Sequence, residues 1–543
     1  MKKLTAAVAF TACLTACTAP RQNTADSQNP VADRVTLIVV NDTYRPDNFA
    51  YLRSLRTELE KNEGDVLVLH AGDFLFPSLL SQRYDGKQMV DVMNLLDGDA
   101  DAHDPYLFVA FGNHEFEKDK LKHAPLLQSR ITESQFDWLG SNIVFKSDSA
   151  GQKLIQGAIL VNSRMVTVNG VKVGLVGATT DLKSADYIDH FLPPAATVGR
   201  ITRELRAQGA QLVIAVTHQT LAEDKAMLET LGDNGPDFVA GGHEHERKHE
   251  IINGRHLVKA DADAASAAVV RISFQQGLQQ NKPQTQVQYV TLPGDYAPSP
   301  AMQHRTSQWN QRFAREYCAD KNAAPDCMQE VLGKTNVELV AEELTIRRFE
   351  TNLGNLLADT ARASYAAEGA QIAFLNSGGM RLNYNIPAGD ITRLHIDTLF
   401  AFPAQLALIR LTGKQLQDVV NHAITDWTGN GRWLQISGFA FQHNPDKGTA
   451  EKLCLITPQG LRPVRPDDVL LAVTNDYLLN REGDQDGYRM LGDDMVVDPA
   501  RKRPDLKDEL IQRLRRDLQN GIAPVVEGRI CNLQQTGTCA RYR

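Results

Sequence analysis

Polar side chains of the kind that bind divalent cations recur in the first half of this 543-residue chain, each time directly after a short apolar run. They form five groups, at Asn41-Asp42, Gly72-Asp73, Gly112-Asn113-His114-Glu115, His218 and Gly241-Gly242-His243-Glu244-His245. Asp, Asn and His without Cys suit a borderline-hard ion such as Mn²⁺, Zn²⁺ or Fe²⁺. So many donors exceed the need of one tetrahedral site. They predict a two-metal centre, with ions about 3.5–4 Å apart, of the kind that hydrolyses phosphoesters.

The apolar runs that precede these groups are predicted to be buried β-strands. They are short and rich in Val and Ile, which favours strands over buried helices. The runs cover residues 35–40, 66–70, 107–111, 171–178, 212–217 and 238–240, with amphipathic stretches such as 49–61 and 202–208 between them. This alternation indicates a layered α/β domain with buried sheets. In such domains ligands bind beyond the carboxyl ends of the strands, which is where the polar groups lie.

A second α/β domain is predicted in the remainder of the chain. Residues 280–300 lack an apolar pattern and hold four prolines, which places a boundary there, and residues 301–332 resemble a helical connector. Further strands are expected at 371–375, 407–411 and 470–473, and helices at 355–366 and 413–423. We therefore expect a signal peptide at 1–16, a tether at 17–33, the metal-binding domain at 34–295, a linker helix at 296–334 and the second domain at 335–543.

Composition excludes several classes of protein. Lys and Arg number 58 against 66 Asp and Glu, so the formal net charge of −8 argues against a protein that binds nucleic-acid polymers. Hydrophobic residues make up 42% and charged residues 23%, which is ordinary for a globular protein. No apolar run reaches the ~20 residues that a membrane span needs.

The N-terminus has the pattern of an export signal. Lys2 and Lys3 precede a short apolar stretch at 4–16, which is typical of a secretory signal peptide. Leu14-Thr15-Ala16-Cys17 resembles the bacterial lipobox, so Cys17 is expected to carry the lipid; the alternative is a signal peptide with an incidental Cys. Thr18 in place of Asp favours the outer membrane. We expect an exported, lipid-anchored protein of the bacterial cell envelope, facing the periplasm or the surface, with no membrane attachment besides the lipid.

The five cysteines beyond Cys17 predict local disulfides rather than catalysis. Cys318 and Cys327 are nine residues apart, and Cys531 and Cys539 are eight apart. Exported proteins can oxidise, which makes two local disulfides plausible and leaves Cys454 as a buried thiol. None of these residues stands in a CxxC motif or beside a His motif, which disfavours a thiol catalyst or a Cys-ligated zinc.

Taken in order, the five polar groups resemble the signature of calcineurin-like metallophosphoesterases, in the version found in 5′-nucleotidases. The second half continues the resemblance to the C-terminal domain of 5′-nucleotidases, through residues 350–355 (Glu-Thr-Asn-Leu-Gly-Asn), 376–381 (Asn-Ser-Gly-Gly-Met-Arg), 402–403 (Phe-Pro) and 483–488 (Gly-Asp-Gln-Asp-Gly-Tyr). The resemblance covers about residues 35–535. It implies a four-layer α/β/β/α metallophosphoesterase domain joined by a helical linker to a C-terminal α/β nucleotidase domain.

The resemblance also implies roles for individual residues. Two divalent ions (Mn, Zn, Co or Fe) would bind to Asp42 and His245 on one side and to Asn113, His218 and His243 on the other, with Asp73 as the bridge. His114, oriented by Glu117, would be the catalytic histidine during attack of a metal-bound hydroxide on a nucleotide phosphoester.

In the second domain the resemblance implies a binding site for the nucleotide substrate. Arg347 and Arg381 would bind the oxyanion edge, because the planar guanidinium pairs bidentately with such groups. Phe402 and Tyr477 would sandwich the base. Asn376 and Asp486 would meet polar groups of the ribose or base.

Four positions depart from the family pattern. Tyr44 stands where a His ligand is usual, and a neutral phenol is a poor ligand for Zn²⁺, so the first metal site and its ion are left open. Glu117 replaces an Asp but keeps the carboxylate. Glu343 replaces an arginine of the substrate cluster, and Ala404 replaces an Asn after Phe402-Pro403, which indicates altered substrate specificity.

Two alternatives to a 5′-nucleotidase follow. The first keeps the enzyme class but moves the substrate to UDP-sugars, 2′,3′-cyclic nucleotides or another phosphoester. The second is a surface binding protein with a degraded metal site, which the departures at Tyr44, Glu117 and Glu343 support. The retained donors at Asp73 and His218 argue against the binding protein, because binding alone needs no complete second metal site.

Overall fold

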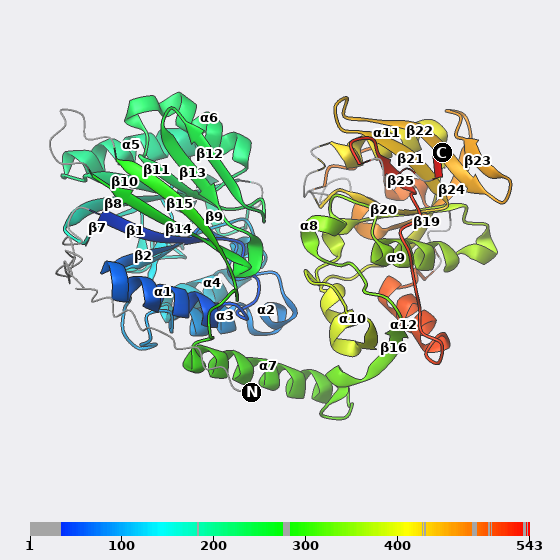
Figure 1. Ribbon diagram of the computed structural model, residues 1–543, viewed down its shortest axis with the longest axis horizontal. Coiled ribbons are helices and arrows are strands. Elements are labelled where there is room, and N and C mark those ends of the chain that lie inside the picture. The colour runs from blue at the N-terminus through cyan, green and yellow to red at the C-terminus, as the bar shows by residue number, and fades with distance from the viewer. Residues whose placement is uncertain are drawn as a thin grey trace, which may run out of the picture.

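The protein is described here by a computed structural model, which covers residues 34–181, 184–274, 283–425, 427, 431–479, 486–497, 500, 502–535, 539, 541 and 542. The expected signal peptide, the tether with Cys17 and the motif residues 483–485 lie outside the described residues. Two lobes stand side by side, and the long helix α7 (Pro300–Asp320) connects them along one edge (Figure 1).

Two mixed sheets form the N-terminal lobe. The first has the order β15-β14-β1-β2-β3-β4-β6, and the second has the order β12-β13-β11-β10-β8-β7. The strands of the first sheet are β1 (Arg34–Val40), β2 (Val66–His70), β3 (Leu107–Ala110), β4 (Asp137–Leu139), β6 (Leu160–Val161), β14 (Ser266–Ser273) and β15 (Gln284–Thr291). Those of the second are β7 (Ser163–Val168), β8 (Val171–Thr179), β10 (Leu212–His218), β11 (Phe238–Gly241), β12 (Lys248–Ile252) and β13 (Arg255–Lys259). A separate pair joins β5 (Ile143–Phe145) to β9 (Ile188–Phe191).

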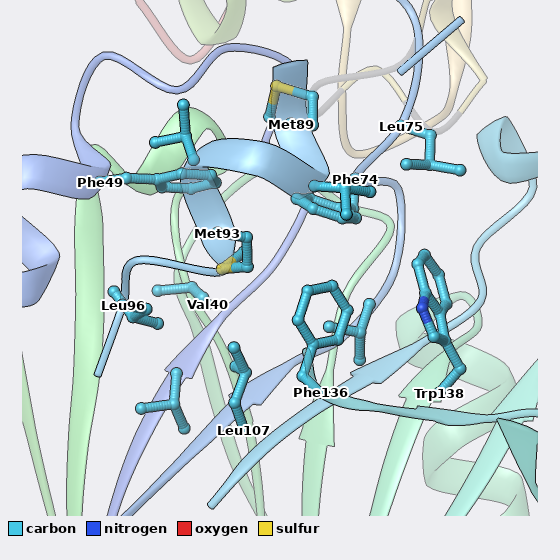
Figure 2. Close-up of a cluster of buried hydrophobic side chains, with 14 of the residues drawn as sticks. Val40, Phe49, Phe74, Leu75, Met89, Met93, Leu96, Leu107, Phe136 and Trp138 are labelled. Atoms are coloured by element: carbon cyan, nitrogen blue, oxygen red, sulfur yellow. The ribbon is translucent and has the colours of Figure 1, made fainter. Parts of the chain in front are cut away.

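The strands read as continuous apolar runs because both of their faces are buried. In β1, Leu37 and Val39 pack into the core between the two sheets, whereas Ile38 and Val40 pack against the helices on the outer face. Those helices are α1 (Phe49–Glu63), α3 (Lys87–Met93) and α4 (Ala124–Glu133), with α2 (Leu79–Tyr84) beside them. Figure 2 shows this outer core, in which the aromatic rings of Phe49, Phe74 and Trp138 lie over the sheet.

Helices α5 (Pro194–Ala207) and α6 (Leu221–Leu231) cover the outer face of the second sheet. The layers are therefore helix, sheet, sheet and helix, which confirms the predicted α/β/β/α architecture. The bounds of the predicted strands differ from the observed ones by at most two residues, and the helix expected at 202–208 is the C-terminal half of α5.

The C-terminal lobe is a smaller α/β structure. Its central sheet has the order β19-β24-β17-β20, and a second sheet has the order β23-β22-β21-β25. The strands are β17 (Ile372–Asn376), β19 (Leu406–Thr412), β20 (Leu434–Ser437), β21 (Phe439–Asn444), β22 (Thr449–Thr457), β23 (Gly460–Pro463), β24 (Val469–Asn475) and β25 (Ile530–Asn532), with a separate pair of β16 (Val331–Thr335) and β18 (Gly389–Thr392). Helices α9 (Asn352–Ala363) and α12 (Leu506–Arg516) pack on one face of the central sheet. Helix α11 (Gly413–Ile424) packs on the other face. Two further helices, α8 (Glu343–Ile346) and α10 (Arg393–Leu399), are short.

Covalent links support the connector and the C-terminus. Disulfides join Cys318, near the end of α7, to Cys327 and join Cys531, within β25, to Cys539, as the spacing predicts. Cys454 is a buried free thiol, also as predicted. Within the residues that the structure covers, no helix is long and apolar enough to cross a membrane.

Candidate metal centre

The polar groups that follow the strands meet in space. Strands β1, β2 and β3 are parallel neighbours, as are β10 and β11, so within each sheet their carboxyl ends share an edge. The connection between the two sheets is direct, because the backbone N–H of His243 donates to Asp42 Oδ2 at 2.8 Å. Within the first sheet, the backbone N–H of Asp42 donates to the carbonyl of Gly72 at 3.0 Å, and that of His114 donates to Asp73 Oδ1 at 2.7 Å.

Left-handed backbone marks four of the candidate ligands. Asp42 (φ 51°), Asp73 (φ 57°), His243 (φ 88°) and His245 (φ 59°) all have positive φ, which is costly for residues with a side chain and clusters at functional sites. Gly72 shows how close the loops approach, since a Cβ there would lie 2.8 Å from His218 Nδ1.

Site 1 consists of Asp42, Asp73 and His245, whose ligand atoms lie within 4.8 Å of one another. Asp42 Oδ1 is 3.2 Å from His245 Nε2. The buried hydroxyl of Tyr44 stands among them, 2.6 Å from His245 Nε2 and 3.4 Å from both Asp42 Oδ1 and Asp73 Oδ2. Adjacent ligands of an octahedral ion at ~2.1 Å lie about 3 Å apart, so the Tyr44 oxygen has the spacing of a further ligand. These residues fit a cation.

The predicted ligands of a second site, called site 2, are Asp73, Asn113, His218 and His243. His218 Nε2 lies 3.2 Å from Asp73 Oδ2 and 3.3 Å from His243 Nδ1. His218 Nδ1–H donates a hydrogen bond to the carbonyl of Ala71 at 2.8 Å, which leaves Nε2 to face the candidate cation site. Asn113 Oδ1 is buried and has no hydrogen-bond partner among the described residues, as expected of an oxygen that awaits a cation. The two sites share Asp73.

His114 lies beside this centre. Its Nδ1 is 2.5 Å from Glu117 Oε1, and its Nε2 is 3.9 Å from Asp73 Oδ2. The predicted pairing of His114 with the longer carboxylate of Glu117 is therefore formed. The imidazole has its Nδ1 anchored and its Nε2 on the side of the shared carboxylate.

Electrostatics favour ionisation of the shared carboxylate of Asp73. Burial opposes ionisation of Asp73, but the charges of His218 and His114 lower its pKa to about 2. Burial disfavours protonation of His218 and His245, yet the carboxylates of Asp73 and Asp42 raise the pKa of His218 to about 9, and Glu343 and Asp42 raise that of His245 to about 10. Burial and the same carboxylates raise the pKa of Tyr44 well above its ordinary value.

Two buried groups that sequence reasoning missed hold the ligand loops. Glu115 accepts the backbone N–H groups of Asp73 (3.0 Å), Phe74 (2.6 Å), Leu75 (3.0 Å) and Gly112 (2.5 Å). The position of Glu115 directly after Asn113 and His114 was the sequence feature that could have indicated this role.

Lys259 is the second of these groups, and its side chain is fully buried. Its ammonium donates to the carbonyls of Gln219 and Gly242 at 2.7 and 2.8 Å, directly after one His ligand and directly before another. Asp224 and Glu244 balance its charge. A lone Lys at the end of a strand carries no signal in the sequence.

The predicted substrate residues lie in the C-terminal lobe. Asn376 Nδ2 donates to Asp486 Oδ2 at 2.8 Å, so these two are brought together. The Arg381 guanidinium lies over the Phe402 ring, 5.6 Å from its centroid. Tyr477 is 40% exposed, and its stacking against a base shared with Phe402 stays a prediction.

The two lobes touch at site 1. Glu343, at the start of α8, lies 2.9 Å from His245 Nδ1 and 2.6 Å from Arg347 Nη2. Arg348 pairs with Glu246, and Asn383 Nδ2 donates to Asp263 Oδ2 at 3.5 Å. Arg347, predicted to hold substrate, thus forms an ion pair with Glu343, at the position where the resemblance implies an arginine.

Comparison with known proteins places this geometry in a family. The model of calcineurin-like phosphoesterases matches residues 35–247, and that of the 5′-nucleotidase C-terminal domain matches residues 331–493. The chain belongs to the 5′-nucleotidase family. Its members include the trifunctional nucleotide phosphoesterase YfkN of Bacillus subtilis, which is 26% identical over 91% of this chain; the match spans 35% of that longer protein.

Other members of the family align over most of their length. A 5′-nucleotidase of Vibrio parahaemolyticus is 24% identical over 73% of both chains. The solved structure of a 5′-nucleotidase precursor from Thermus thermophilus shares the fold, with a TM-score of 0.70 at 20% identity over 92% of this chain and all of that one. Membership of this metal-dependent hydrolase family agrees with the cation sites described above.

Proposed function

We propose that this protein hydrolyses nucleotide phosphoesters outside the cytoplasm, releasing phosphate and nucleoside. The observation that carries the proposal is the candidate cation group of Asp42, Asp73 and His245, with the predicted ligands of a second site and His114 beside it and the Arg381–Phe402 pair on the lobe that touches it. Neither lobe holds both the cation sites and the candidate base-binding residues, so the substrate would bridge them.

Each part of the site has a role in this reaction. Divalent cations at sites 1 and 2 would polarise the phosphoryl group and lower the pKa of a water. Asp73 would hold both cations at a fixed separation. His114, anchored by Glu117 through Nδ1, would present Nε2 to charge that develops on the phosphoryl oxygens or on the leaving group. Arg381 and Phe402 would hold the nucleotide by charge and by stacking.

The test is a hydrolysis panel on metal-free and metal-loaded protein. Chelator-treated chain should lose phosphate release from nucleoside monophosphates and regain it with Mn²⁺, Zn²⁺ or Co²⁺. UDP-sugars, 2′,3′-cyclic nucleotides and a small aryl phosphate complete the panel. Bound metal without turnover of any ester would contradict the enzymatic proposal and favour a surface binding protein.

One observation favours an altered substrate within the same enzyme class. The Glu343 carboxylate pairs with Arg347, so an arginine expected to grip an oxyanion already has a partner. Ala404 also lacks the amide that the family resemblance expects. A preference for a UDP-sugar or a cyclic nucleotide over a nucleoside monophosphate in the panel would support this second candidate.

Export and anchoring form part of the proposal. The leader and Cys17 suggest a lipid-anchored protein of the cell envelope, on the outer membrane, and the domain divisions at 34–295, 296–334 and 335–543 are proposed on the same sequence grounds. The substrate would be a small nucleotide from that compartment.

A further inference from the structure

The contact between Glu343 and His245 joins a candidate metal ligand to the opposite lobe. Glu343 is the first residue of α8, at the edge of the C-terminal lobe that faces the N-terminal lobe (Figure 1). His245 follows β11 in the N-terminal lobe, 98 residues earlier. The carboxylate lies 2.9 Å from Nδ1, and both side chains are almost fully buried.

This contact decides which ring nitrogen of His245 faces the cation site. Nδ1 lies against Glu343 Oε1, while Nε2 lies 3.2 Å from Asp42 Oδ1. A metal-binding His commonly directs its other ring nitrogen at a carboxylate, which fixes the orientation of the ring and makes it a stronger ligand. In this chain that carboxylate comes from the other lobe.

Glu343 is itself held in place. Its carboxylate lies 2.6 Å from the Arg347 guanidinium, one turn along the chain, and Glu342 accepts the N–H groups of Leu344 and Thr345 to cap the short helix. A buried carboxylate with a fixed partner is a rigid support for an imidazole. The arrangement differs from the arginine that the family resemblance expects at 343, because an arginine would bring a positive charge to the His245 imidazole where Glu343 brings a negative one.

We propose that Glu343 is a positioning residue of site 1, which it completes only when the two lobes are docked. Cation affinity at site 1 is then coupled to the pose of the C-terminal lobe, and by linkage a cation at site 1 favours the docked pose. The inference rests on the cation sites of the proposed function and adds to them a dependence on a residue of the substrate-binding lobe.

The test measures Mn²⁺ binding to the full-length metal-free chain, with no substrate present. Calorimetry and electron paramagnetic resonance of free Mn²⁺ give the number and affinity of sites. Glu343→Gln should weaken one Mn²⁺ site by about 10–100-fold and leave the other unchanged, as supporting carboxylates do elsewhere. Glu343→Arg should weaken the same site at least as much.

Two further variants separate positioning from general docking. Arg348→Gln removes another ion pair between the lobes, with Glu246, and should leave both Mn²⁺ affinities within about threefold of wild type. In a His245→Ala background, Glu343→Gln should cause no further loss, because its effect runs through the imidazole. Thermal unfolding of the metal-free variants checks that they fold.

Contrary results are distinguishable. Wild-type Mn²⁺ binding in Glu343→Gln would overturn the positioning role while leaving the proposed function intact, as would an equal loss in Arg348→Gln or an additive loss in the double variant. A wild-type chain that binds no Mn²⁺, Zn²⁺ or Co²⁺ would overturn both.

Discussion

Replacing the shared carboxylate by an amide, Asp73→Asn, tests the centre at its middle. The backbone is conserved in this variant, because Asn tolerates the positive φ and its carbonyl oxygen can still accept the N–H of His114 at 2.7 Å. The substitution removes the negative charge of Asp73, which faces His218 and Tyr44. Burial opposes that charge and the neighbouring imidazoles stabilise it, lowering the pKa of Asp73 from 3.8 to about 2.

The magnitude follows from these contacts. A depression of that size corresponds to about 2 kcal/mol of stability at neutral pH, since one pKa unit is about 1.36 kcal/mol. The metal-free variant should therefore lose roughly this much stability. Because both cation sites lose a shared ligand, phosphate release from an aryl phosphate should fall at least ~10²-fold, or about 2.7 kcal/mol in the barrier.

The assay pairs elemental analysis of bound metal with phosphate release at saturating Mn²⁺, so that weak binding and slow turnover are separated. Urea unfolding of the metal-free protein measures the change in the free energy of unfolding. A variant with wild-type metal content and a rate within a few-fold of wild type would refute the assignment of Asp73 as the shared ligand.

Further outcomes are expected for other positions. Tyr44→His should raise affinity for Mn²⁺ or Zn²⁺ at site 1, measured by calorimetry, and an unchanged affinity would place the Tyr44 oxygen outside the coordination sphere. Phe402→Ala and Tyr477→Ala should each cost about 1–3 kcal/mol of base stacking, raising KM for nucleotides far more than for an aryl phosphate; equal losses on both substrates would make the rings structural. Burial lowers the pKa of His443 to about 4, so the neutral form is favoured in the fold and the free energy of unfolding should fall as pH drops from about 6.5 toward 4. His443→Phe should flatten this dependence in urea titrations, and an identical pH profile would contradict it. Cys17→Ser should release the protein from membranes or leave it uncleaved, and continued membrane fractionation would refute the lipid anchor.

Much of the N-terminal lobe was predictable from the sequence. Strands buried on both faces leave unbroken runs of Val, Ile and Leu, and the carboxyl ends of such strands are known ligand positions. For this reason Asp42, Asp73 and His218 could be assigned to the carboxyl ends of strands from the sequence alone, and the α/β/β/α layers are confirmed.

Side-chain contacts between distant segments were not predictable in the same way. Glu343 reads as a lost arginine in the sequence, whereas in the fold its carboxylate meets an imidazole of the other lobe. Lys259 shows no pattern at all, yet it holds two ligand loops through their carbonyls. Periodicity reports which face of an element is buried, and it carries no information on which single polar groups will meet across a domain boundary.

The left-handed backbone at the candidate ligands also changes how mutations at this centre should be interpreted. At Asp42 and Asp73 an alanine would remove a ligand and also place an ordinary side chain at positive φ, where Asp and Asn are better tolerated. An alanine variant would therefore combine the loss of the ligand with a backbone strain of the order of 1–3 kcal/mol. Alanine scanning would therefore overstate the chemical contribution of these positions. Asp→Asn is the better substitution for these positions. Asn tolerates positive φ as Asp does, so the backbone cost stays nearly constant and only the ligand chemistry changes.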